Sequence, residues 1–203
     1  MLTTTKQELK SFEDLARSFA AKELAANREE HDRYPFGPFF DDVLARAYEV
    51  GLLGATLPED CGGIGQGISA LCVILEHISA VDASLGGIIF TNAFAQEILL
   101  TAGGKELLAG VMDKAADAPS ALIAFPAFAN PSETGVSLEA AKANHVHRLS
   151  GGIHYVVLGG LAGHALVPAR IKGQKNYSFF LVDLVHQGVA KSRPIFSLGL
   201  HAC

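Results

Sequence analysis

The seven residues from Cys61 to Gly67 include four glycines, a density that is also found in loops that bind ligands. Such loops cradle phosphate groups because their backbone lies close to the ligand and donates N–H groups. A nucleotide-binding loop also needs a preceding strand, a strand–helix–strand unit and a Lys-Ser or Lys-Thr pair. The sequence around Cys61–Gly67 has none of these features. A structural glycine turn is therefore the favoured interpretation, and phosphate binding is the alternative.

Histidine and cysteine are the residue types that could bind a metal ion. His145 and His147 are two positions apart, so on a strand both rings would lie on one face, as in some zinc sites. No third ligand is spaced to join them, and a surface pair on a hairpin is favoured. Cys61, Cys72 and Cys203 form neither a C-x-x-C pair nor an even-numbered disulfide framework, which indicates a reducing compartment. We therefore predict no metal site.

The first part of the chain has the pattern of a helical domain. Thr5 and Glu8 form a capping box at the start of a long amphipathic helix. A second helix over Phe39–Val50 ends at Gly51, because glycine commonly terminates helices. Apolar residues at helical spacing predict three more helices, over 68–79, from a cap at Asp82 or Ser84 to Leu100, and over 105–116.

At Pro119 the hydrophobic period changes from helical to strand-like. Short segments rich in strand-forming residues then alternate with turns that contain Asn and Gly. These segments cover 121–125, 145–149, 153–158, 165–171, 177–183 and 189–193. We predict an α+β protein in which an all-helical domain over 1–118 is followed by a small antiparallel β-barrel or sandwich domain over 119–203.

The composition is apolar, with 49% hydrophobic and 18% charged residues. A large buried interface with another domain or chain would explain this excess. Ala83–Ala102 comes closest to a membrane span, but Asn92, Gln96 and Glu97 interrupt it, so we predict none. The N-terminus lacks the basic and apolar regions of a secretory signal. We expect a cytoplasmic location and leave the mitochondrial matrix open.

Four short motifs follow one another in the first domain. They are Gly51–Gly54, Pro58–Gly65, Glu76–Ser79 and Asp82–Ser84. This order resembles the N-terminal helical domain of the acyl-CoA dehydrogenases, which read G-L-L-G, P-E-x-x-G-G-x-G, an E-E-L-A-like helix and D-A-S. The shared order and spacing make the match specific. At the other end, Phe196–Cys203 resembles a K-L-G-L/M-R-A/C-S-D segment inside the β-domain of the same family.

The resemblance implies a ligand set and an assembly. Acyl-CoA dehydrogenases use FAD to desaturate acyl-CoA thioesters in fatty acid metabolism, and they continue into a second helical domain. That domain usually supplies the catalytic glutamate. Glu76, Glu97 and Glu133 match the catalytic glutamate by residue type only, so we assign no catalytic residue here. The implied partners are an acyl-CoA substrate and either further copies of this chain or a chain that supplies the helical domain.

Charge is unevenly distributed between the two predicted domains. Residues 1–118 hold nine Lys and Arg against eighteen Asp and Glu, whereas residues 119–203 hold seven against three. A basic second domain suits the phosphate groups of FAD or coenzyme A, and ordinary surface variation explains the difference equally well. The basic residues are scattered along the sequence, so we do not expect nucleic-acid binding.

Two β-domain motifs, T-E-P-G-x-G-S-D and W-I-T-N, hold the flavin in this family. A register without gaps is anchored by Ser150–Gly151 and Ala169–Arg170. It aligns two ring-binding threonines with apolar residues, a phosphate-binding serine with a proline, and a stacking Trp with a tyrosine. The cofactor-binding residues implied by the resemblance are Phe125, Asn130, Pro131, Tyr155 and Val157.

The loss of polar side chains at these positions leaves two interpretations open. Each polar group of the ligand that is left without a hydrogen-bond partner weakens binding by about 1–3 kcal/mol. The flavin site is either divergent and functional, with Ser132, Glu133 and Thr134 as substitutes, or degenerate in a flavin-poor, non-catalytic subunit. We favour the first interpretation, and with it an acyl-CoA dehydrogenase-type oxidoreductase.

Overall fold

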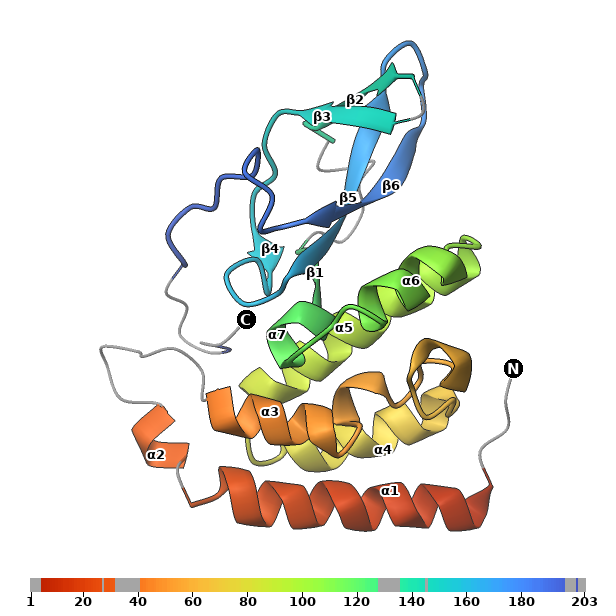
Figure 1. The fold of residues 1–203 in the computed structure, drawn as a ribbon. Helices are drawn as coiled ribbons and strands as arrows, with labels where there is room; N and C mark the ends of the chain where they lie inside the picture. The colour runs from red at the N-terminus through yellow and green to blue at the C-terminus, as the bar shows by residue number, and fades with distance from the viewer. Residues whose placement is uncertain are drawn as a thin grey trace.

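The computed structural model describes residues 5–26, 28–31, 41–127, 136–144, 146–195 and 200. Its first part is helical and its last part is a sheet (Figure 1). The α-helices are α1 (Lys6–Phe19), α2 (Arg28–His31), α3 (Asp41–Glu49), α4 (Ile68–Ser79), α5 (Ala83–Thr101), α6 (Lys105–Met112) and α7 (Ala118–Ala121). A π-helical turn, Ala20–Leu24, extends α1, and two 3-10 turns, Leu52–Gly54 and Glu59–Cys61, lie between α3 and α4.

The predicted capping box begins α1. The Glu8 N–H donates to Thr5 Oγ1 at 3.3 Å, and the Thr5 N–H donates to the Glu8 carboxylate at 2.7 Å. The Thr5 hydroxyl and N–H hold the pKa of Glu8 below its usual value, because both hydrogen bonds favour the charged carboxylate. The other predicted cap is also present: Asp82 accepts from the Leu85 N–H at 2.9 Å at the start of α5.

Helix α5 is the central helix, and it is buried on all sides except one face, where Phe90, Phe94 and Glu97 are exposed. It packs against α4, α6 and strand β1 (Ile123–Pro126). By length and composition alone α5 could cross a membrane. Half of its apolar window is buried inside the protein, and the polar side chains of Asn92 and Gln96 are buried with it. These observations identify α5 as a core helix of this fold.

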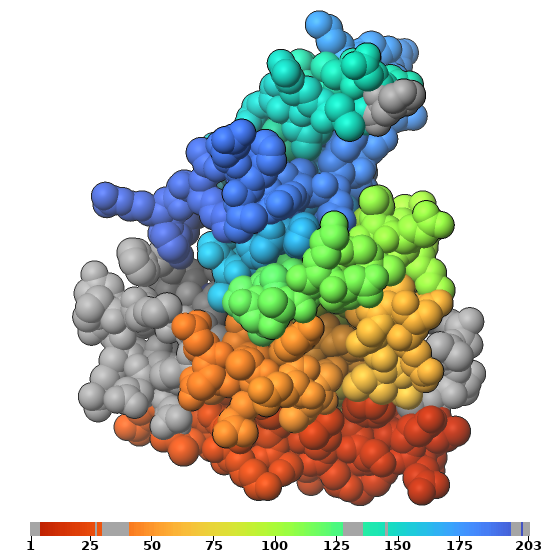
Figure 2. All heavy atoms as spheres, viewed as in Figure 1, coloured from red at the N-terminus to blue at the C-terminus, as the bar shows by residue number. Residues whose placement is uncertain are grey.

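Asn92 connects α5 to both neighbouring layers. Its Nδ2 donates to the Leu53 carbonyl at 2.9 Å, and its Oδ1 accepts from the Ile123 N–H at 2.9 Å. Leu53 belongs to the turn before the glycine loop, whereas Ile123 opens the sheet. One buried side chain therefore ties the loop, the central helix and the first strand together. Figure 2 shows the resulting stack, with the α6–α7 region (green) between the α3 region and the sheet.

The sheet has six strands in the order β3-β2-β5-β1-β4, and β6 pairs with the other edge of β5. The strands after β1 are β2 (Glu139–Ala143), β3 (Val146–Ser150), β4 (Val156–Val157), β5 (His164–Ile171) and β6 (Tyr177–Asp183). β1 pairs with the start of β5, and β2 pairs with its end. β5 is therefore the axis of the sheet, and its residues from Ala165 to Ala169 are buried.

The α+β class is confirmed, but the prediction of an antiparallel sheet is wrong. β1 and β2 both run parallel to β5, while the β1–β4, β2–β3 and β5–β6 pairs are antiparallel. The prediction failed because it assumed that strands adjacent in sequence pair with each other. Here β1 and β2 lie far from β5 in sequence and pair with it across long connections, which parallel pairing requires.

Two strand assignments also differ from the prediction. The alanine-rich segment Glu139–Ala143 forms β2, although Ala, Glu and Lys are poor strand formers, because it pairs with β3 and β5. The predicted strand over 189–193 is absent, and the segment is largely exposed. The predicted domain boundary at 118/119 falls inside α7, and that boundary stays a prediction.

Candidate functional site

The glycine loop uses its backbone donors internally. The N–H groups of Gly62 and Gly63 donate to the carbonyls of Glu59 and Pro58. Those of the next three residues, 64–66, donate to the carbonyls of Gly54, Leu57 and Ala55 at 2.8–3.1 Å. A phosphate-binding loop needs free N–H groups that point at the ligand. The loop is therefore a structural turn, preceded by a 3-10 turn instead of a strand.

Two of the glycines are required by geometry. A Cβ on Gly63 would lie 2.1 Å from the Leu57 carbonyl oxygen, so only glycine fits there. Gly51, which ends the helix before the loop, has φ +80°, a left-handed conformation that side chains disfavour. The predicted helix stop at Gly51 is confirmed.

An ion pair fastens the loop to α6. The Lys105 ammonium donates to the Asp60 carboxylate. This hydrogen bond lowers the pKa of Asp60 and raises the pKa of Lys105, because it favours the charged form of each group. Next to the pair, burial raises the pKa of the Cys61 thiol, and the neighbouring Asp60 charge acts in the same direction. Cys61 is therefore a protonated, inert thiol at neutral pH.

The structure brings two of the predicted flavin residues together. Phe125 in β1 and Val157 in β4 are directly opposite each other in the antiparallel β1–β4 pair. The alignment of both residues with flavin-binding threonines stays a prediction. Neither side chain has a polar atom, so neither can replace the hydrogen bond of a threonine hydroxyl.

Phe125 is a packing residue, with 8% of its surface exposed. Its ring meets that of Phe94 on α5 edge to face, with 5.2 Å between centroids, and that of Phe179 on β6 at 5.9 Å. These contacts place Phe125 in an apolar cluster that joins α5 to the sheet. Local sequence pattern does not reveal Phe94 and Phe179 as partners of Phe125. The one available signal is that Phe90 and Phe94 are one helical turn apart, which would place both rings on one face of a helix.

Tyr155 has an unusual backbone and an open ring. Its φ is +56°, which is uncommon outside glycine, and 68% of the residue is exposed. Its carbonyl accepts from the Ala127 N–H at 2.7 Å, which extends the β1–β4 pairing. The one ring contact recorded for Tyr155 among the described residues is with His154, at 6.3 Å between centroids, so the ring is largely open to solvent.

The remaining predicted residues are placed as follows. Some predicted residues lie outside the described residues: Asn130, Pro131, the substitutes Ser132, Glu133 and Thr134, and His145. Glu76 and Glu97 are exposed on α4 and α5. In the described ranges no three His, Cys, Asp or Glu side chains gather in a way that could hold a metal ion.

The predicted flavin residues fit the cofactor poorly at the two ring-binding positions. Tyr155 offers a stacking surface, but the two positions that should hydrogen-bond the ring are apolar and Phe125 is packed into the core. The side-chain contacts expected from the resemblance are therefore missing at Phe125 and Val157. Any hydrogen bond from this part of the site must come from the backbone.

Comparison with known proteins assigns the family. The acyl-CoA dehydrogenase N-terminal domain family matches residues 6–118, more than half of the chain. The CarC subunit of the caffeyl-CoA reductase–Etf complex from Acetobacterium woodii is 24% identical over 97% of this chain and 53% of its own length. Mitochondrial isovaleryl-CoA dehydrogenase from Solanum tuberosum is 32% identical over 38% of this chain and 19% of its own length.

Solved structures show the same fold. Butyryl-CoA dehydrogenase from Megasphaera elsdenii superimposes with a TM-score of 0.82 at 20% identity, over 100% of this chain and 55% of its own. The chain thus spans about half the length of the relatives that it matches end to end. From the match over residues 6–118 and this shared fold, the chain belongs to the acyl-CoA dehydrogenase family.

Proposed function

We propose that this chain is the helical and β portion of an acyl-CoA dehydrogenase-type flavoprotein. Completed by a C-terminal helical domain, in the same polypeptide or in a partner chain, it catalyses FAD-dependent α,β-desaturation of an acyl-CoA thioester. The observation that carries this proposal is the match of nearly the whole chain with about half of each of two relatives that are named for acyl-CoA substrates. The names of these relatives, caffeyl-CoA reductase and butyryl-CoA dehydrogenase, support a CoA thioester as the substrate class.

An exposed aromatic surface supports the need for a further domain or chain. Phe90 and Phe94 are 52% and 46% exposed on α5, and their rings stack at 5.9 Å. Adjacent exposed phenylalanines on a core helix are typical of a surface that another domain covers. One relative is a subunit of a complex with Etf, which favours an assembly with an electron-transfer partner. We also propose a cytoplasmic location, which rests on cysteine usage alone.

A second candidate function is that of a flavin-poor, non-catalytic subunit. The packing of Phe125 between Phe94 and Phe179 favours it, because the resemblance aligns Phe125 with a flavin-binding threonine and this ring offers no hydroxyl. A chain of this kind would keep the family's assembly surfaces without performing the redox step.

The two candidates differ in whether the complete assembly holds FAD. The protein is purified with its C-terminal helical domain or partner chain, and flavin absorbance and dye reduction with a panel of acyl-CoA thioesters are measured. The first proposal predicts a yellow protein that reduces the dye. The second predicts a folded, colourless assembly that stays inactive after FAD is added. Turnover by residues 1–203 alone would contradict both, because no residue here is assigned as the base.

A further inference from the structure

Five of the seven Lys and Arg residues in 119–203 gather at one end of the sheet. They come from the β2–β3 hairpin, the end of β5 and the turn between β5 and β6: Lys142, Arg148, Arg170, Lys172 and Lys175. The strand pairing brings these segments together, because Ala140 pairs with Ile171 and the Lys172 N–H donates to the Ala140 carbonyl at 2.9 Å. These residues are scattered along the sequence, and the fold collects them. We call the five residues the basic tip.

The basic tip is exposed and has little acidic compensation. All five of its residues are exposed, and none of them forms an ion pair with another described residue. Glu139, which is opposite Arg170 in the β2–β5 pair, is the one acidic residue in β2, β3, β5 and the turn over 172–176. Five positive charges therefore stand against one negative charge at this end of the sheet.

Two exposed apolar side chains lie within the basic tip. Val146 at the start of β3 is 66% exposed, and Tyr177 at the start of β6 is 39% exposed. Tyr177 is directly opposite Arg170 in the β5–β6 pair. Val146 is opposite Ala143, next to Lys142, in the β2–β3 pair. Basic side chains around exposed apolar ones suit an anionic membrane surface, because the charges attract the head groups while the apolar groups enter the interface.

The rest of the molecule has the opposite charge. Residues 1–118 hold eighteen Asp and Glu against nine Lys and Arg. Figure 1 shows α1 at the end of the molecule opposite to the β2–β3 hairpin. A negatively charged surface therefore attracts the basic tip and repels the helical part, which favours a single orientation of docking. At physiological salt the field of a charge falls off over about 8 Å, so acidic residues at the far end weaken this attraction little.

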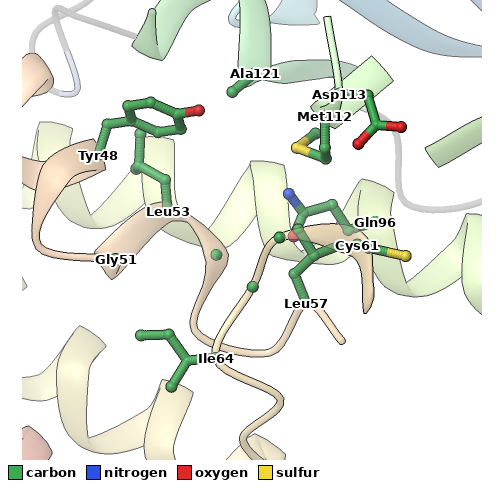
Figure 3. Close-up of a pocket in the computed structure, with 13 residues that line it drawn as sticks. Tyr48, Gly51, Leu53, Leu57, Cys61, Ile64, Gln96, Met112, Asp113 and Ala121 are labelled. Atoms are coloured by element: carbon green, nitrogen blue, oxygen red, sulfur yellow. The ribbon is translucent and has the colours of Figure 1, made fainter. Parts of the chain in front are cut away.

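The shape of the basic tip suits a surface better than a small anionic ligand. Small ligands bind in concave pockets, whereas the tip is a projecting hairpin and turn (Figure 1). The cavity in Figure 3, of about 130 Å³, is elsewhere, beside the glycine loop. Its lining includes Asp113 and no Lys, Arg or His, so it does not attract an anion either. Charge and shape together fit the tip to an extended anionic surface.

We propose that the basic tip docks this protein on an anionic phospholipid membrane, with Val146 and Tyr177 at the level of the head groups. Docking of this kind is peripheral, and α5 stays in the core. It is independent of the proposed redox function, because it needs neither FAD nor a catalytic base. Each Lys or Arg near an anionic membrane surface strengthens binding roughly fivefold, so the five together give measurable, salt-sensitive binding.

Co-sedimentation with lipid vesicles tests the charge requirement. The purified protein should bind vesicles of phosphatidylcholine mixed with phosphatidylserine, should not bind vesicles of phosphatidylcholine alone, and should be released by high salt. Lys172→Gln together with Lys175→Gln should weaken binding about 20- to 30-fold. Lys191→Gln together with Arg193→Gln is the matched control, because both residues are exposed, lie outside the tip and change the net charge equally. This control should weaken binding far less.

Tryptophan fluorescence tests which part of the protein meets the lipid. The chain has no tryptophan, so a single introduced Trp is the one reporter. On phosphatidylserine vesicles the emission of Val146→Trp should shift to shorter wavelength. Ile68→Trp, at the 56% exposed first residue of α4, should not shift.

Four outcomes would overturn the proposal. They are equal binding to both kinds of vesicle, equal losses in the two double variants, an unshifted Val146→Trp emission while the protein is bound, and binding of coenzyme A or an oligonucleotide by the tip without binding to vesicles.

Discussion

At the scale of single residues, the key observation is that one carboxamide holds three segments in register. Asn92 contacts Leu53 and Ile123, which are 39 and 31 residues away in sequence. From the sequence, Asn92 and Gln96 are only interruptions of an apolar helix. The partners of Asn92 are invisible to a local pattern, since a hydrogen bond over this separation depends on the assembled fold.

Asn92→Leu should destabilise the protein strongly. The change leaves the Leu53 carbonyl and the Ile123 N–H buried without their partner, at about 1–3 kcal/mol each. We expect a loss of about 2–5 kcal/mol in the free energy of unfolding, measured by urea denaturation. Gln96→Met, at the next turn of α5, is the matched control. It removes a polar group with an unpaired oxygen and should be neutral or stabilising. Equal losses of unfolding free energy in Asn92→Leu and Gln96→Met would contradict the role given to Asn92.

At the scale of elements, the glycine loop is held by sterics and by its own hydrogen bonds. Gly63→Ala should destabilise the protein by about 1–3 kcal/mol or more, because the added Cβ would meet the Leu57 carbonyl oxygen. Gly110 inside α6 is the control, since a Cβ there meets nothing within 4 Å. Gly110→Ala should stabilise by about 0.5–1 kcal/mol through helix propensity. Thermal unfolding should show a lower melting temperature than wild type for Gly63→Ala and a higher one for Gly110→Ala.

The Asp60–Lys105 ion pair should make the stability of the protein depend on pH, because it holds the start of the glycine loop against α6. The pKa of Asp60 is lowered, so its stabilising contribution is present above its ordinary value of 3.8 and is lost as pH falls through the folded-state value. The pKa of Lys105 is raised, so its contribution is present below 10.5 and is lost as pH rises through its folded-state value.

Lys105→Met tests this pH dependence. The variant should have a lower unfolding free energy than wild type near neutral pH. This difference should shrink at very low pH, at very high pH and in high salt. Lys114, exposed and without an ion pair to any described residue, is the control position. A difference that persists unchanged below pH 3.8 would show that Lys105 acts by packing instead of charge.

Local pattern predicted the helices well and the sheet less well. α4 and β6 occur at the predicted residues, because each has a strong period and clear boundaries. β2 could not be predicted from Glu139–Ala143, since its strand conformation comes from its neighbours β3 and β5. Phe125 and Val157 pair across β1 and β4, and their alignment with the family's threonines stays a prediction. The packing of Phe125 against Phe94 and Phe179 depends on three-dimensional contacts and was not predicted.

At the scale of the whole molecule, Phe125 lies where the helices meet the sheet. Its cluster contains Leu57, which precedes the glycine loop, Leu99 from α5 and Leu166 from β5. Replacing this ring with a small side chain should cost about 3–5 kcal/mol. Phe125→Thr would therefore also loosen this junction between the helices and the sheet. Val157 is only half-buried, so it is the better position for testing the cofactor site.

Val157→Thr should raise FAD affinity of the completed assembly. Threonine has nearly the volume of valine, and one regained hydrogen bond contributes about 0.5–1.5 kcal/mol, which is roughly two- to tenfold in Kd. Val156→Thr is the matched control, because adjacent strand residues face opposite sides of the sheet. FAD titration followed by flavin fluorescence measures both variants. If Val157→Thr binds FAD no more tightly than Val156→Thr, position 157 does not face the flavin, and the register that aligns it with the family's threonine is wrong.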